Sequence, residues 1–170
     1  MADTAIKIGM GTLLGGGFAI WRAHLGNQNQ ARKIYLDKKR ELIEKVLDDI
    51  DAVYASATIY WANLSNAVFM RDGGRRLTAK ETDELNNLER QLFGDFKIFG
   101  FCSSRLLLVG EEQAEQSLRD LRNAIDGFFK IGSVANDKCT QEVLQSHRDL
   151  IQAKRLELFA SLHSAYKRAD

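Results

Sequence analysis

Proline is absent from this chain of 170 residues. At the average usage of ~5%, about eight prolines would be expected in a chain of this length. Because proline removes a helical hydrogen bond and clashes with the preceding turn, its absence favours long uninterrupted helices. Leu, Ala, Glu, Lys, Arg and Gln, which are good helix formers, are abundant. The composition therefore predicts an all-α protein.

The chain also has few cysteines and a small net charge. The two cysteines, Cys102 and Cys139, form no CxxC motif and no Cys/His metal-binding spacing, so they predict neither a disulfide framework nor a zinc site. Twenty-four basic residues are balanced by 23 acidic ones, which leaves a formal net charge of +1. So small a charge gives no overall attraction for nucleic acid. We therefore expect no nucleic-acid partner.

Long apolar runs are rare, with one exception near the N-terminus. Residues 8–21 form an uncharged, glycine-rich run of 14 residues that ends at Trp21 and Arg22. A membrane-spanning helix needs ~20 apolar residues, with ~17 near the lower limit. Trp21 and Arg22 are typical of an interfacial anchor, and Lys7 can extend toward the other surface, which lengthens the usable span. Residues 1–25 are therefore predicted to form a membrane helix in contact with lipid.

Small residues recur at every fourth position of this segment, at Gly11, Gly15, Ala19 and Ala23. On a helix this spacing places them on one face, where two backbones can approach closely within lipid. In water such a helix is unfavourable, because each glycine costs ~1 kcal/mol relative to alanine. The pattern predicts a seam that pairs copies of the chain into a homo-oligomer.

The charges that follow the run indicate its orientation. Residues 22–45 contain seven basic and three acidic side chains. Because basic flanks stay on the cytoplasmic side of a membrane, we expect a single-pass protein whose residues 26–170 form a cytoplasmic domain. One alternative is an interfacial or protein-buried segment, since the run is short for a span. A cleaved signal peptide is disfavoured, because a basic start and a small-residue cleavage site are both missing.

Apolar residues between about 31 and 70 repeat with the period of a coiled coil. They step by three and four positions, with the register broken only at Arg40: Leu36, Ile43, Leu47, Ile50, Tyr54, Ala57, Trp61, Leu64 and Val68. A sustained 3.5-residue repeat predicts a long helix packed against one or more partner helices. The residues expected to contact another chain are Leu36, Ile43, Leu47, Ile50, Tyr54 and Trp61.

Start and stop signals predict three further helices. The glycines of residues 71–76 end the long helix, and Thr78 with Glu81 forms a capping box that begins the next one. That helix stops at Gly110, and a loop at residues 131–137 separates the last two helices. Short loops make neighbouring helices antiparallel, so we expect a four-helix-type bundle with one extra-long helix.

Each of the last two predicted helices carries one apolar stripe. The stripes are Ala114, Leu118, Leu121, Ile125 and Phe128, then Leu144, Ile151, Leu158, Leu162 and Ala165. The helix before them contains Gly94 and Gly100, where we expect a close helix crossing or a kink. Its residues 96–101 and 106–109 are more apolar than a single stripe requires, which suggests a groove for another chain.

No residue pattern predicts catalysis, a cofactor or a metal ion. Di-iron sites on helices need a glutamate three positions before a histidine, and His24, His147 and His163 lack one. The acidic cluster at residues 48–51 occurs once and is typical of a solvated helix face. The arginines of residues 71–76 suit a plain turn, with a phosphate contact as the alternative. We therefore expect a protein that is not an enzyme.

Three functional hypotheses follow from these patterns. The first is a membrane-tethered helical bundle that acts through protein–protein contacts, as a scaffold or regulator, in homo-oligomeric form. The second is a membrane-perturbing or pore-forming effector whose glycine-rich helix is released on oligomerisation. The third is a soluble helical regulator whose N-terminus is buried by a partner protein.

Overall fold

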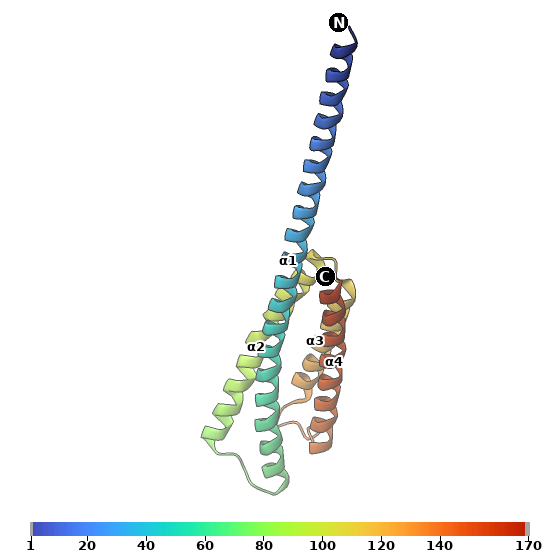
Figure 1. The fold of residues 1–170 in the computed structure, drawn as a ribbon. Helices are drawn as coiled ribbons and strands as arrows, with labels where there is room; N and C mark the ends of the chain where they lie inside the picture. The colour runs from blue at the N-terminus through green and yellow to red at the C-terminus, as the bar shows by residue number, and fades with distance from the viewer. Residues whose placement is uncertain (1, 169–170) are drawn as a thin grey trace. The chain divides into compact units, whose positions relative to one another are not determined.

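The computed structural model describes the backbone of residues 2–168 and the side chains of residues 30–168. Over residues 2–168 the chain forms four helices and no strand: α1 (Ala2–Asp72), α2 (Ala79–Leu108), α3 (Glu112–Ile131) and α4 (Gln141–Lys167) (Figure 1). The prediction of an all-α bundle is confirmed for this part of the chain. The chain divides into two compact units, Met1–Lys39 and Arg40–Asp170.

The first unit belongs to α1, and its side chains are described only from residue 30 onward. The predicted seam and anchor residues, Gly11, Gly15, Ala19, Ala23, Trp21 and Arg22, lie outside the described side chains. The membrane helix of residues 1–25, its boundary at residue 26 and the cytoplasmic orientation therefore stay predictions. Among the described residues, no helix has the length and apolar character needed to cross a membrane.

In the second unit, helices that follow one another run antiparallel, and α1 is also antiparallel to α4 (Figure 1). Contacts at both ends of the pairs fix this order. They are Glu44–Tyr166 and Ser65–Gln141 between α1 and α4, Phe93–Phe129 and Ser103–Glu115 between α2 and α3, and Ser117–Ser161 and Phe128–His147 between α3 and α4. The short loops thus give the antiparallel arrangement expected from the sequence.

Local signals set the ends of the helices as predicted. The Thr78 hydroxyl accepts a hydrogen bond from the Glu81 amide at 3.3 Å, and the Glu81 carboxylate accepts one from the Thr78 amide at 2.8 Å. These bonds satisfy amides that the first turn of α2 leaves without helical partners. Gly74 and Gly110 follow α1 and α2 with φ of 79° and 73°, a conformation that favours glycine. The Thr140 side chain caps α4.

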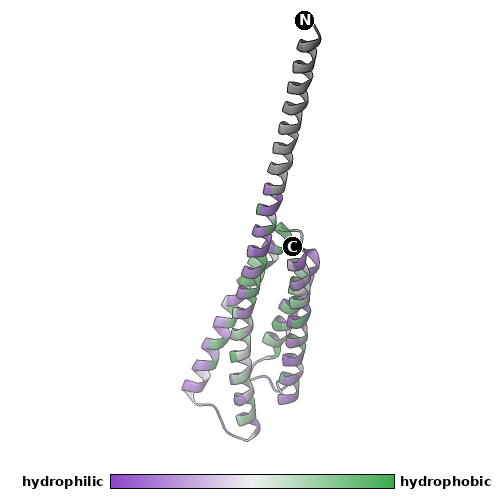
Figure 2. Cartoon of the chain, viewed as in Figure 1, coloured by the Kyte–Doolittle hydropathy of each residue, from purple (hydrophilic) through white to green (hydrophobic). Residues whose placement is uncertain are grey.

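The core lies between the four helices of the second unit, along which hydrophobic and hydrophilic residues alternate (Figure 2). Both predicted stripes of α3 and α4 are buried. On α1 the buried stripe is wider than predicted: Ile43, Ile50, Ala57 and Leu64 are joined by Val46, Val53, Tyr60 and Ala67, whereas Leu47, Tyr54 and Trp61 are half-buried. A helix that packs against neighbours on both sides needs such a broad apolar face.

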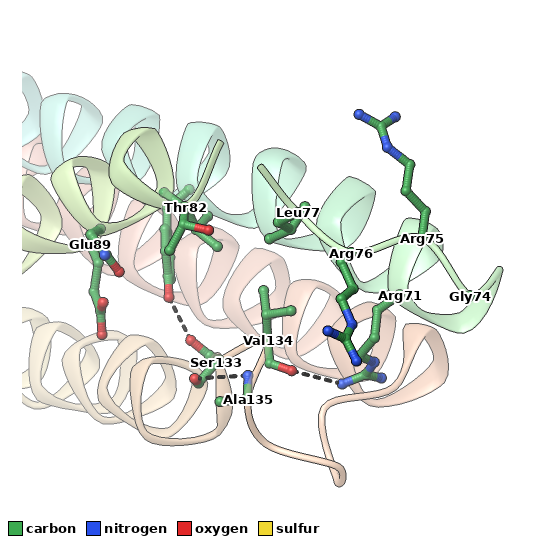
Figure 3. A pocket seen from close by; sticks show the side chains of 14 residues that line it. Arg71, Gly74, Arg75, Arg76, Leu77, Thr82, Glu89, Ser133, Val134 and Ala135 are labelled. Carbon is green, nitrogen blue, oxygen red and sulfur yellow. Dashed lines mark hydrogen bonds between the residues drawn. The ribbon is translucent and has the colours of Figure 1, made fainter. Parts of the chain in front are cut away.

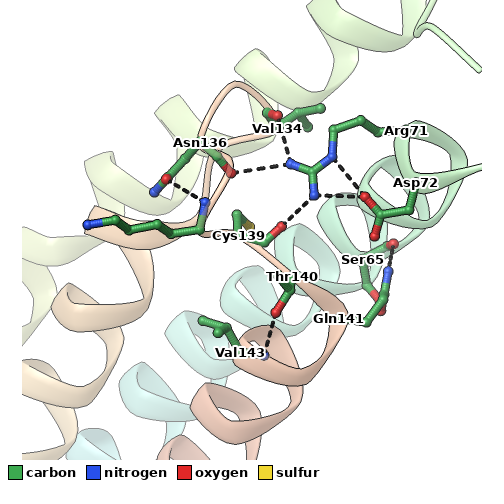
Figure 4. A network of polar contacts seen from close by, with 10 residues as sticks. Ser65, Arg71, Asp72, Val134, Asn136, Cys139, Thr140, Gln141 and Val143 are labelled. Atoms are coloured by element: carbon green, nitrogen blue, oxygen red, sulfur yellow. Dashed lines mark hydrogen bonds and ion pairs between the residues drawn. The ribbon is translucent and has the colours of Figure 1, made fainter. Parts of the chain in front are cut away.

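Arg71, near the end of α1, ties the loop between α3 and α4 to the bundle (Figure 4). Its guanidinium donates to the backbone carbonyls of Val134 at 3.1 Å, Asn136 at 3.2 Å and Cys139 at 2.8 Å. Its other two bonds go to the carboxylate of Asp72. A guanidinium has five N–H donors, and all five are used here. Arg71 is therefore a structural residue of this end of the bundle.

Candidate functional site on the outer face of helix α2

Helix α2 carries two apolar stripes, of which only one faces the core. The inner stripe, Leu92, Phe99, Cys102 and Leu106, is buried. Three large side chains elsewhere on the helix are mostly exposed, with 66% of Phe93, 59% of Phe101 and 75% of Leu108 open to solvent. Single exposed apolar residues are ordinary, but several on one element are typical of an interaction surface.

The exposed apolar residues share one side of α2. Steps of eight and seven residues separate Phe93, Phe101 and Leu108, which brings them to the same side of a 3.6-residue helix. Gly100 and Ser104 lie between them on that side. The Ser104 hydroxyl donates to the Gly100 carbonyl at 3.0 Å, so it is satisfied within the helix. We call these five residues the outer face of α2.

Gly94 and Gly100 are not used for packing against any described part of the chain. A Cβ built on either residue meets no neighbouring atom within 4 Å in the described structure. The expectation of a close helix crossing at these glycines is therefore wrong, since α2 continues through both with open space beside them. Each interior glycine costs a helix ~1 kcal/mol relative to alanine. The two glycines therefore lower the stability of α2, and packing within the described structure gives no reason for them.

A crevice of about 320 Å³ borders the outer face where α2 meets α3. Inside it the buried Glu115 carboxylate accepts hydrogen bonds from the Ser103 hydroxyl and the Arg119 guanidinium, both at 2.6 Å. Burial raises the pKa of Glu115, but these two bonds and the Arg119 charge outweigh it and hold the pKa below the usual value. Arg119 and Arg122 line the crevice. Because the Arg119 charge is balanced by Glu115, Arg122 supplies the positive charge at this border of the outer face.

Five of the six contact residues predicted on α1, those from Ile43 onward, lie against the chain's own core. Leu36 belongs to the first unit, and its contact with another chain stays a prediction. Ile43 and Ile50 are buried, and Leu47, Tyr54 and Trp61 pack beside them. The Trp61 indole donates to the Leu144 carbonyl at 2.9 Å, and the Arg148 guanidinium lies 4.4 Å from the centre of its ring. This face of α1 is therefore occupied within one chain by α4, and its contact with a second chain stays a prediction.

The sequence indicated part of the site on α2. The apolar excess at residues 96–101 and 106–109 was the signal, and it includes Phe101 and Leu108. Phe99 and Leu106 of the same segments belong to the core. Phe93 lies outside both segments, and its exposure shows that the outer face begins there.

Other candidate groups have structural explanations. The acidic cluster at residues 48–51 supplies ion pairs to two neighbouring helices, Asp49 to Arg105 of α2 and Asp51 to Arg155 of α4. Cys102 and Cys139 are buried, and burial together with the Asp49 charge raises the pKa of Cys102 to about 11 against the opposing effect of Arg105. Among the residues described, no three His, Cys, Asp or Glu side chains gather as a metal site would need.

Comparison with known proteins gives this chain no relative. No family model, no curated protein and no solved structure matches it. The function is therefore inferred from the residues themselves. Of the surfaces described, the outer face of α2 combines the most exposed apolar side chains with glycines that the fold leaves unused.

Proposed function

We propose that this protein is a membrane-tethered helical bundle that acts by binding another protein along the outer face of α2. The observation that carries the proposal is the pairing of exposed Phe93, Phe101 and Leu108 with a glycine that has open space beside it. A partner helix can come close to the α2 backbone at Gly100 and place apolar side chains between the two phenylalanines. The partner surface is expected to be apolar with an acidic residue toward Arg122.

The membrane tether is supported by the sequence of residues 1–25. The apolar run, its anchor at Trp21 and Arg22, and the basic stretch that follows favour a single span with the bundle in the cytoplasm. The four-residue spacing of Gly11, Gly15 and Ala19 supports pairing of the tethers. Two paired bundles would present two outer faces of α2. A dimeric partner could bind both at once, with a higher affinity than a single face would give.

Site-specific photo-crosslinking in the source cell tests the binding surface. A photoreactive amino acid is placed at Phe101 of the full chain and, as a matched control, at Leu156 of α4, which has the same 59% exposure. We expect a discrete crosslinked protein from position 101 and none from position 156. A second variant, Leu108→Glu, should remove the crosslink at position 101 and leave the melting temperature unchanged. Equal crosslinking from both positions would disprove binding through the outer face.

Partitioning between cytosol and alkali-washed membrane tests the tether. The full chain should remain with the membrane, and a chain of residues 26–170 should be released. Release of both chains would support a partner-buried N-terminus instead. Dye leakage from vesicles that depends on residues 1–25 would favour the membrane-perturbing hypothesis over the tether.

A further inference from the structure

A pocket of about 600 Å³ opens at the end of the second unit where α1 leads into α2 (Figure 3). Its walls come from the end of α1, the loop that leads into α2, the first turns of α2 and the loop between α3 and α4. Leu77, Leu85, Val134 and Ala135 give it an apolar lining. This volume and lining are typical of sites that bind small molecules.

The three arginines that line this pocket differ in their bonding. Arg71 uses all five of its donors on the bundle, as described above. Arg75 extends in another direction and donates to the Glu81 carboxylate at 2.9 Å (Figure 3). Arg76 reaches toward the guanidinium of Arg71 and, among the described residues, has neither a hydrogen bond nor an ion pair (Figure 3). Two neighbouring guanidinium groups, one with all of its donors available, favour a bound anion.

Glu89 lies at the opposite end of the pocket, with Thr82 and Val134 between it and Arg76 (Figure 3). Its half-buried carboxylate has no hydrogen bond or ion pair with any described residue. The nearby Tyr60 hydroxyl donates to the Gly132 carbonyl at 2.5 Å and is not available to it. Burial and then the charge of Glu89 raise the pKa of Tyr60 well above its usual range, so the hydroxyl stays neutral. A carboxylate in this position favours a bound cation.

We propose that this pocket binds a short zwitterionic ligand, an apolar peptide of about four residues with free ends. Its terminal carboxylate would bind Arg76, its terminal ammonium would bind Glu89, and its side chains would contact Leu77 and Val134. The length is estimated from the rise of α2, whose first residue, Ala79, comes three positions after Arg76. Glu89 lies ten residues beyond Ala79, or ~15 Å along α2, and four extended residues span ~13 Å. This inference is independent of the protein-binding role of α2.

Titration calorimetry with the full chain in detergent micelles tests the proposal. The probes are a pool of apolar tetrapeptides with free ends, the same peptides with an acetylated N-terminus, and the same peptides with an amidated C-terminus. We expect the free peptides to bind and each blocked form to bind at least tenfold more weakly. Absence of heat or saturation at 10 mM free peptide would overturn the proposal, and so would equal affinity of the free and blocked forms.

Substitutions assign each end of the ligand. Arg76→Gln should weaken binding at least tenfold and make it insensitive to C-terminal amidation. Glu89→Gln should do the same for N-terminal acetylation. Arg75→Gln is the control, because Arg75 lines the pocket but is paired with Glu81, and it should bind as the parent chain does. Thermal melts of all three variants should match the parent, since none of these side chains belongs to the core. If either charge-removing variant kept the parental response to the blocked peptides, the assigned orientation would be wrong.

Discussion

Gly132 and Gly100 lie in two regions of the bundle that differ in how closely neighbouring atoms pack against the glycine. A Cβ on Gly132 would lie 3.0 Å from Leu64 Cδ2 and 3.0 Å from the Phe128 carbonyl oxygen, whereas a Cβ on Gly100 would meet no described atom within 4 Å. The first glycine lets the loop after α3 pack tightly on α1. Gly100 destabilises α2, and no packing contact within the described structure compensates for it. A glycine of the second kind, beside exposed Phe101, points to a contact outside the chain.

The surroundings of the two glycines follow the same contrast. Around Gly132 the structure is closely packed. The Tyr60 hydroxyl donates to the Gly132 carbonyl, the centres of the Tyr60 and Phe128 rings are 5.6 Å apart, and Arg71 holds the loop that follows. Around Gly100 the described structure has open space and the shallow crevice to α3. Substitutions in the first region should therefore change stability, and substitutions in the second should change binding.

Arg71→Ala should have the largest effect on stability. Three bonds to loop carbonyls are lost, and at ~0.5–1.5 kcal/mol net for each bond the bundle should lose about 2–4 kcal/mol. Chemical denaturation measures this loss. Arg76→Ala is the matched control, because Arg76 lines the same pocket and should change the free energy of unfolding by no more than ~0.5 kcal/mol. Equal losses for the two variants would show that the arginine bonds do not hold the loop.

Gly132→Ala should destabilise the bundle by about 1–3 kcal/mol, because a methyl group at this position must displace Leu64 or the last turn of α3. In a chain of this size, each kcal/mol lowers the melting temperature by ~2–4 °C. Calorimetry of the variant beside the parent gives the measurement. An unchanged melting temperature would mean that the loop can move away at no cost, and the contrast with Gly100 would fail.

Gly100→Ala should have the opposite sign. Because alanine is the better helix former and its methyl group enters open space, the bundle should gain up to ~1 kcal/mol. The same methyl group should hold a partner helix away from the backbone and weaken crosslinking from position 101. The variant therefore raises the melting temperature while it lowers binding. Higher stability with unchanged crosslinking would remove Gly100 from the interface.

Most of the fold was predictable because its signals are local. The capping box at Thr78, the glycine after α1 and the single stripe of α3 each act within a few residues, and the structure has all three where expected. The width of the buried stripe on α1 was not predictable to the same degree. Whether Val46 or Leu47 is fully buried depends on where α2 and α4 lie, which the period of one helix does not determine.

The candidate sites were less accessible to sequence reasoning, because they depend on which surfaces remain open after packing. A helix with glycines and an excess of apolar residues fits a crowded crossing as well as an exposed face, and the wrong expectation of a close crossing at Gly94 and Gly100 came from this ambiguity. The pocket combines Arg76 and Glu89 with Val134, more than forty residues further along the chain. Only the folded chain brings these residues together.

The smallest predicted effect concerns the bond that joins α2 to α3 beside Gly100. Burial raises the pKa of Glu115, but the bonds from Arg119 and Ser103 lower it overall, so it is lower in the folded state than in the unfolded chain. The stability that this carboxylate contributes is therefore present above the ordinary glutamate pKa of ~4.3 and is lost as the pH falls through the folded pKa.

Glu115→Gln should accordingly lose less stability than the parent between about pH 5 and pH 3. Glu112→Gln removes the same charge from the exposed side of α3 without removing these two bonds, and it serves as the control. Urea denaturation at each pH compares the three chains. If both variants followed the same pH profile, α3 would be joined to α2 mainly by the packing of Phe93 and Phe96 on Phe129. The crevice beside Gly100 would then keep its shape in acid, and partner binding at the outer face should be as insensitive to pH as the α2–α3 contact itself.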